Sequence, residues 1–219
     1  MQTDRREMLS GGSVPTLRCL PCRITPVSAE GGPLRQDSVR IAPLSADEFT
    51  DEQKALVGDW HHLNFSRVLV RHPGMYRVFL PLLDRLIRGS TLPPRDREIL
   101  CIRTLALGGD VYEGHHHVTI ARKAGMTEAE IEAARTGDAG LSQFDQCLVT
   151  AAEELVRQQC VSDPTWACLA ERYSRQQLME AVFLVGCYSI MAMITRSFGI
   201  EVEQDPEIDQ RLAKLREYT

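Results

Sequence analysis

The sequence predicts an all-α protein, and three observations support that prediction. Helix-start signals recur along the chain, apolar residues repeat at three- and four-residue spacings, and neither period-two alternation nor an Asn-Gly or Asp-Gly turn marks a hairpin. The chain has 219 residues, of which 43% are hydrophobic and 25% are charged. That composition is typical of a globular protein with a buried core.

The first forty residues are expected to form an extension to the helical part. Residues 1–36 mix arginines with Ser, Gly and Pro and lack a sustained apolar period. They have no hydrophobic centre of a secretory signal, so we expect a cytoplasmic protein. Cys19 and Cys22 have the spacing of a redox or zinc motif, but no neighbouring ligand pair or helix start completes either site. We therefore expect a loop-like extension over 1–40 and a helical domain over 41–219.

Helices are expected from Ser45 onward. Ser45 and Glu48 have the spacing of a capping box, which predicts a helix from there to about Trp60. Later helix starts are marked by caps or prolines and several ends by glycines. These signals predict helices over residues 73–88, 95–107, 111–124, 127–136 and 144–159, one beginning at Asp163, a long apolar one from Ser174 to Phe198, and a polar one from Asp205 to Arg216.

Charge and hydropathy exclude two classes of partner. Lys and Arg number 25 against 30 Asp and Glu, which gives a formal charge of −5, and no basic block stands out. Nucleic acid is therefore not an expected partner. The most apolar run, Ala181–Ile194, has only 14 residues and includes Gly186 and Tyr188, which is short for a membrane span. We expect a buried core helix there and no membrane partner.

The seven cysteines are expected to be reduced. Their number is odd, and a chain of this size does not need disulfides to fold. Five of them lie at apolar helical positions, where a thiol packs as a small hydrophobic group. These are Cys101, Cys147, Cys160, Cys168 and Cys187.

The densest polar cluster is the run DVYEGHHH over residues 110–117. Residues three and four apart share a helix face, so Glu113 is expected beside His116 and His117, whereas His115 faces away. A carboxylate and an imidazole in contact can exchange a proton near neutral pH. The sequence therefore points to proton-transfer chemistry at this helix.

The preceding helix supplies further candidates. Glu98 is a second carboxylate that the Gly-Gly connection would fold back against the histidines, and Arg97 and Arg103 are candidate anchors for an anion. A metal site would need a further ligand, and no HExxH motif or matching partner is recognisable in the sequence. No metal is therefore expected.

With these residues the chain resembles the carboxymuconolactone decarboxylase family, within the alkylhydroperoxidase D-like superfamily of all-helical proteins. The resemblance spans roughly residues 46–201. It rests on Arg97-Glu98-Ile99-Leu100, on Tyr112-Glu113 followed by His117, Ala121 and Gly125, and on Leu184-Val185-Gly186-Cys187-Tyr188 ahead of Phe198-Gly199-Ile200. It implies an alkylhydroperoxidase D-like helical bundle that assembles as a homo-oligomer, with a dimer, a trimer and a hexamer all open.

The resemblance disfavours one branch of the superfamily. In the peroxidase branch a Glu is followed, after eleven residues, by a Cys-x-x-Cys pair and then by a His. In this chain Glu98 and His117 keep that register, but Asp110 and Glu113 stand where the two cysteines would be. Carboxylates cannot perform thiolate attack and disulfide formation, so thiol peroxidase activity is not expected.

The decarboxylase branch keeps the Tyr-Glu and the His, and it implies a cofactor-independent enzyme. Its substrate would be a lactone, a β-keto acid or another enolisable carboxylated small molecule, such as one of secondary metabolism. His117 would donate or accept the proton, Glu113 would orient His117 or act as a second base, and Tyr112 and His116 would donate hydrogen bonds. Isomerisation, dehydration or cyclisation would use the same residues, and a non-catalytic oligomeric scaffold is the alternative from another class.

One position departs from the decarboxylase branch. Gly114 stands where that branch commonly has a large aromatic residue, and glycine costs a helix about 1 kcal/mol relative to alanine. Either the missing side chain widens the pocket for a larger substrate or lets a ligand approach the backbone, or it lets a neighbouring helix pack closely.

Overall fold

The computed structural model describes residues 38–138 and 140–204, and all regular structure in these ranges is helical. The prediction of an all-α fold is confirmed. The Cys19/Cys22 pair and the helix expected from Asp205 lie outside the described residues. The helices are α1 (Asp51–Val57), the 3-10 helix η1 (Gly58–His62), α2 (Asn64–Leu69), α3 (Pro73–Arg88), α4 (Pro94–Gly108), α5 (Val111–Lys123), α6 (Glu128–Thr136), α7 (Gln143–Gln158), α8 (Asp163–Ala170) and α9 (Arg175–Phe198).

The first helix begins later than the spacing of Ser45 and Glu48 predicts. Glu48 Oε2 does accept a hydrogen bond from the Ser45 amide at 2.7 Å, but these residues close a turn. Thr50 makes the complete capping box, with Gln53, and α1 follows it. The short helix α2 was not expected from the sequence. It matters for the site because it brings the backbone of Asn64 and Phe65 against α5 and the chain after α9.

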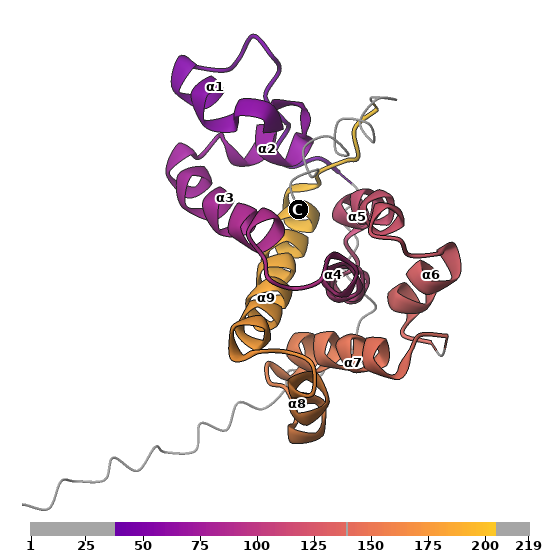
Figure 1. Ribbon diagram of the computed structural model, residues 1–219. Coiled ribbons are helices and arrows are strands. Elements are labelled where there is room, and N and C mark those ends of the chain that lie inside the picture. The colour runs from indigo at the N-terminus through magenta and orange to yellow at the C-terminus, as the bar shows by residue number, and fades with distance from the viewer. Residues whose placement is uncertain (1–37, 139, 205–219) are drawn as a thin grey trace, which may run out of the picture. The chain divides into compact units, whose positions relative to one another are not determined.

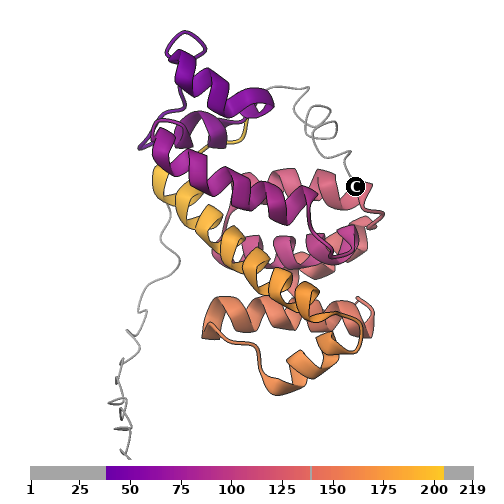
Figure 2. The same cartoon turned by 60° about the vertical axis from the view of Figure 1, so that its left-hand side comes forward.

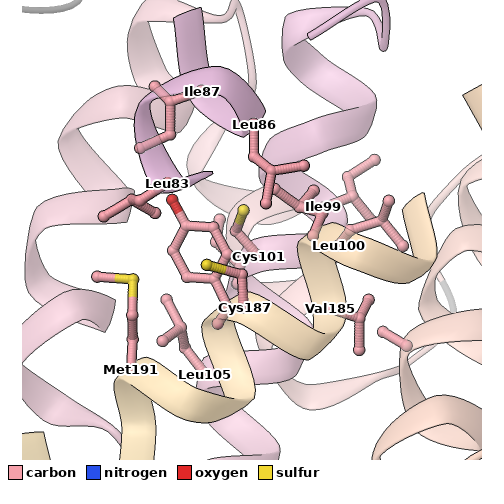
Figure 3. Packing of buried hydrophobic residues seen from close by; sticks show 14 of the residues in the cluster. Leu83, Leu86, Ile87, Ile99, Leu100, Cys101, Leu105, Val185, Cys187 and Met191 are labelled. Atoms are coloured by element: carbon pink, nitrogen blue, oxygen red, sulfur yellow. The ribbon is translucent and has the colours of Figure 1, made fainter. Parts of the chain in front are cut away.

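The central helix is α4, which packs against α5, α6, α7 and α9 (Figure 1). Its apolar residues Ile99, Leu100 and Leu105 are buried and belong to the same core cluster as Val185 of α9 (Figure 3). Because neighbouring helices surround α4, its polar residues are buried as well. Arg97, Glu98, Arg103 and Thr104 are all among the buried side chains.

The connection between α4 and α5 is as tight as the sequence predicts. Gly109 adopts a left-handed conformation with φ 65° and ends α4, and Asp110 caps α5 by accepting a hydrogen bond from the Glu113 amide at 3.1 Å. The chain therefore reverses within two residues. This reversal returns α5 along α4 and sets the histidines of α5 beside Glu98.

The long apolar helix α9 lies beside α3 and α4 (Figure 2). Within the described residues it is the one helix long and apolar enough, by length and composition alone, to cross a membrane. Half of its most apolar stretch is buried inside the protein, including Leu184, Val185 and Tyr188. The helix thus contributes one face to the core, as the sequence predicts.

The expectation that all cysteines are reduced is wrong for two of them. Cys147 of α7 and Cys168 of α8 form a disulfide. The two residues are 21 positions apart, and the turn between α7 and α8 brings them together, a proximity that composition does not reveal. Cys101 and Cys187 are buried and form no disulfide, whereas Cys160 is free and exposed.

Candidate active site

A buried carboxylate and imidazole join α4 to α5. Nδ1 of His117 lies 2.6 Å from Oε2 of Glu98, and 1% of each side chain is exposed. The His117 ring also makes an edge contact with Tyr188 of α9, with ring centroids 4.8 Å apart. Glu98 is therefore the carboxylate that orients His117, and the pair lies inside the protein.

A second carboxylate–imidazole pair lies one residue earlier on α5. Nε2 of His116 is 2.9 Å from Oε2 of Glu203, which follows α9 in the chain. The other oxygen of Glu203 accepts hydrogen bonds from the Tyr112 hydroxyl at 2.6 Å and from the Asn64 amide at 2.5 Å. The Tyr112 hydroxyl in turn accepts from the Phe65 amide at 3.1 Å. Glu203 thus ties α5, α2 and the segment after α9 into one buried network.

The ionisation of this network follows from its burial and its hydrogen bonds. Burial raises the pKa of Glu203, but the hydrogen bonds from His116, Tyr112 and Asn64 outweigh it and leave the pKa below its ordinary value. Burial and the nearby charges of Glu113 and Glu203 hold the pKa of Tyr112 well above its ordinary value. At neutral pH Glu203 is therefore a carboxylate and Tyr112 a neutral donor.

Burial also raises the pKa of two further groups near Glu113. Burial raises the pKa of the Asp110 carboxyl, although the hydrogen bond from the Glu113 amide offsets part of that effect. Burial and the charge of Glu113 raise the pKa of the Cys187 thiol to about 11. The Cys187 thiol is therefore neutral at physiological pH and a poor nucleophile.

A cavity of about 360 Å³ opens onto Glu113 and His116. The rest of its wall is mostly apolar and aromatic, and Ser66, Arg77, Asp84 and Arg88 are its other polar members. The apolar wall is formed by Leu56, Trp60, Leu63, Phe65, Tyr76, Leu80, Pro81, Leu83, Ile87 and Met191. An apolar pocket on which a few polar groups converge is the usual form of a small-molecule site.

Glu203 also borders a second, larger cavity. This cavity, of about 590 Å³, is lined on its other sides by residues that include Lys54, Arg67, His61 and His62. Neither Glu113 nor His116 lines it. We therefore place the candidate site in the smaller cavity, where a carboxylate and an imidazole from one turn of α5 converge.

The structure separates the sequence-predicted residues into three groups. Glu113 and His116 line the cavity, and Tyr112 holds Glu203 behind His116. Glu98 and His117 form the buried pair between α4 and α5 and are not part of the cavity wall. The third group comprises Arg97, Arg103 and Gly114, which lie outside the wall.

The two arginines expected to anchor an anion are engaged with the protein. Arg97 is buried, donates to the Ile87 carbonyl at 2.6 Å and lies 3.5 Å from Oε1 of Glu98. Arg103 points toward α6 and α7, where its Nε donates to Oε1 of Glu153 at 2.8 Å. Arg77 and Arg88 are instead the arginines on the cavity wall.

Gly114 does not make a close contact with another helix. A Cβ built there would meet no atom within 4 Å, apart from its own helix backbone and chain neighbours. The close-packing explanation for this glycine is therefore wrong within the described chain. The wider-pocket explanation finds no direct support either, because Gly114 is not part of the cavity wall.

One group of side chains could hold a metal ion. Ligand atoms of Glu98, Cys101 and His117 lie within 4.8 Å of one another, and all three residues are buried. The sequence did not reveal Cys101 as a neighbour of His117, because only the packing of α4 on α5 brings them together. The hydrogen bond between Glu98 and His117 by itself accounts for the closeness of two of the three groups.

Sequence reasoning missed Glu203 and Asn64. Glu203 is 87 residues from His116 in the chain, and it follows α9 without any local motif. Asn64 lies on the helix α2 that was not predicted. The contact between Glu203 and His116 joins distant segments, so no spacing along the chain could have shown it.

Comparison with known proteins agrees with this architecture. Residues 73–158 match the model of the Carboxymuconolactone decarboxylase family. The matched span runs from α3 to the end of α7 and contains Glu98, Glu113, His116 and His117. No curated protein matches the chain.

Several solved structures share the fold. An alkylhydroperoxidase AhpD core from Ralstonia eutropha JMP134, an uncharacterized peroxidase-related protein, is similar with a TM-score of 0.67 and 14% identity, over 76% of this chain and 93% of that chain. An uncharacterized peroxidase-related protein from Silicibacter sp. TM1040 has a TM-score of 0.65 and 14% identity, over 80% and 96%. The debrominase Bmp8 has a TM-score of 0.65 and 13% identity, over 81% and 100%. The fold is therefore AhpD-like, and within it residues 73–158 match the model of the carboxymuconolactone decarboxylase family.

Proposed function

We propose that the protein is a cofactor-independent enzyme that transfers a proton to or from a small enolisable molecule bound in the cavity at Glu113 and His116. The observation that carries the proposal is this convergence of a carboxylate and an imidazole on an otherwise apolar wall. In such an environment proton transfer between fixed groups is efficient, because few solvent molecules compete for the proton. Decarboxylation of a lactone or a β-keto acid is the reaction that we propose first.

The chemistry of decarboxylation matches these groups. When the C–C bond to the carboxylate breaks, CO2 leaves and the bonding electrons move into the neighbouring carbonyl to give an enolate. His116 donates a proton to the enolate carbon, and its hydrogen bond to Glu203 fixes the position of its ring. Glu113 is the second proton-transfer group on the same cavity wall. The substrate itself accepts the electron pair, so no cofactor is required.

The cavity wall also supports a carboxylated substrate. Arg77 and Arg88 are its two arginines, and each has an acidic neighbour at present, Glu52 at 2.7 Å from Arg77 and Asp84 beside Arg88. Both arginines are more than one third exposed. Exchanging an exposed ion pair for a bound carboxylate costs little, because such pairs contribute at most about 1 kcal/mol.

The pair of His117 and Glu98 has a supporting role in this proposal. It lies behind the cavity wall and fixes the orientation of α5 relative to α4. The alternative of a non-catalytic scaffold is favoured by one observation, the complete burial of this pair. Isomerisation, dehydration and cyclisation are related reactions that the same cavity groups could support.

A comparison of adjacent histidines tests the proposal. The full-length protein is incubated with a panel of lactones and β-keto acids, and CO2 release and deuterium uptake from D2O at the enolisable carbon are measured. We expect His116→Asn and Glu113→Gln to lower turnover by about 100-fold or more. His115→Asn changes the exposed neighbouring histidine and should leave turnover within about twofold, as expected for a residue outside the site.

Two outcomes contradict the proposal. Equal turnover in folded His115→Asn and His116→Asn variants would remove His116 from its role. A wild-type protein that neither binds nor converts any member of the panel would favour the non-catalytic scaffold.

For the intact protein we further propose a cytoplasmic location. We also propose that its partners are small molecules and not nucleic acids or membranes.

A further inference from the structure

The exposed side of α9 carries an apolar stripe that the described chain does not cover. Its members follow one face of the helix and are Met179, Val182, Gly186, Ile190 and Met193, with Phe183 beside them. The five side chains of this set are between 39% and 66% exposed. No charged residue occurs from Ala181 to Thr195. In Figure 2 α9 lies in the foreground beside α3.

The stripe is symmetric about its glycine. Gly186 is the twelfth of the 24 residues of α9. Four positions to either side of it stand Val182 and Ile190, and seven positions to either side stand Met179 and Met193. If two copies of α9 crossed antiparallel at Gly186, Met would face Met, Val would face Ile, and Gly would face Gly. A surface that matches itself in this way is what a two-fold symmetric contact requires.

No contact within the described part of the chain explains Gly186. A Cβ built there would meet no atom within 4 Å outside its own helix backbone and chain neighbours. A glycine inside a helix costs about 1 kcal/mol relative to alanine. At the crossing point of two helices, however, a missing side chain lets the backbones approach closely. A second helix at this point would account for the glycine.

The exposed area also suits a protein contact. Side chains of this size at these exposures leave on the order of 100 Å² each, so the stripe with Phe183 offers about 500 Å², near the upper end of what monomers expose in one patch. Two copies would bury about 1,000 Å² together, the lower bound of a specific interface.

We propose that the protein forms a two-fold symmetric homodimer contact through α9, with the two helices antiparallel and crossing at Gly186. The occupant of the stripe is thus a second copy of this chain. The contact permits a dimer, or a hexamer that contains two-fold axes, and it excludes an isolated trimer because a trimer has no two-fold axis. The proposal is independent of the chemistry at Glu113 and His116.

Oligomeric state is the first test, measured by light scattering on the full chain. We expect the wild type to have twice the mass of one chain, or six times that mass. Ile190→Glu should remove the two-fold contact, whereas Trp166→Glu on α8 should not, although the two parent side chains are 44% and 45% exposed. Helical circular dichroism confirms that both variants fold. A monomeric or trimeric wild type would overturn the proposal, as would two variants with the same mass.

Crosslinking tests the geometry. In a background with Cys19, Cys22 and Cys160 replaced by Ser, which removes the exposed free thiol of the described residues and the two cysteines outside them, Gly186→Cys should link two copies under mild oxidation. Met193→Cys should not, because its two copies would stand 14 residues apart along the helix, about 21 Å at 1.5 Å per residue, beyond the ~7 Å limit for a disulfide. Efficient linkage through Met193→Cys would indicate a parallel pair and overturn the proposal.

A vesicle experiment tests the other possible occupant of the stripe. If the wild type floats with phosphatidylcholine vesicles and Ile190→Glu abolishes that flotation, the stripe binds a membrane and the proposal is overturned.

Discussion

Nδ1 of His117 and Oε2 of Glu98 lie 2.6 Å apart in the interior, whereas the adjacent His116 reaches the cavity wall. Two consecutive histidines of α5 thus occupy different environments. A step of one residue turns a helix by about 100°, which is enough to direct one ring into the α4–α5 interface and the other toward the cavity. His117, the position that the sequence emphasises, thus lies in the helix interface, and His116 is the histidine on the cavity wall.

The buried pair predicts a large stability effect. Replacing Glu98 by Ala leaves His117 in the interior without its carboxylate, so we expect the free energy of unfolding to fall by about 3–5 kcal/mol. Urea denaturation measures it. The control is Glu128→Ala, which breaks the exposed pair with Arg122 and should cost under about 1 kcal/mol. Similar losses in the two variants would contradict the assignment of the Glu98–His117 pair as a structural link.

The network at Glu203 predicts a pH-dependent stability. Its pKa lies below the ordinary value of 4.5 in the folded state, so its contribution is present above pH 4.5 and is lost as the pH falls through the folded-state pKa. Glu203→Gln should therefore destabilise by on the order of 2 kcal/mol at neutral pH, and by less in acid. Urea denaturation from pH 7 to pH 3 measures this. A difference that stays constant, or that grows in acid, would show that the charge of Glu203 is not the cause.

The disulfide predicts sensitivity to reductant. Cys168→Ser opens the link to Cys147, and a loop of this length is worth about 3 kcal/mol. We expect a lower urea midpoint for the variant and for the reduced wild type. Cys160→Ser serves as the control, since that thiol is free and exposed, and it should leave the midpoint unchanged. Non-reducing peptide mapping that finds both Cys147 and Cys168 alkylated would refute the bond directly.

The open space at Gly114 predicts a stabilising substitution. Gly114→Ala should raise the free energy of unfolding by about 1 kcal/mol, because it gains helix propensity and meets no atom. Turnover should not change, since Gly114 does not line the cavity. Gly108→Ala is the matched control: its Cβ would lie 2.9 Å from that of Ala192, so it should destabilise. A Gly114→Ala variant with altered substrate preference would instead support the wider-pocket hypothesis.

The sequence by itself determined the helices from α3 to α9. Their starts carry strong local signals, such as the capping box of Thr127 and Glu130 and the one at Ser174 and Gln177, and both boxes form as expected. Local hydrogen bonds decide where a helix begins, so a few adjacent residues are sufficient evidence. The helix start predicted at Ser45 is wrong, because the hydrogen bond between Ser45 and Glu48 closes a turn. The capping box of Thr50 and Gln53 begins the helix instead.

The sequence also located the polar cluster on α5, because helical spacing fixes which of its residues share a face. Tertiary structure alone decided which of them reach a cavity. The partner of His116 is Glu203, the arginines on the cavity wall are Arg77 and Arg88, and Cys147 is bonded to Cys168. Each of these results joins segments that are distant in the chain. These contacts depend on how the helices pack against one another, and the spacing of residues within one helix does not predict that packing.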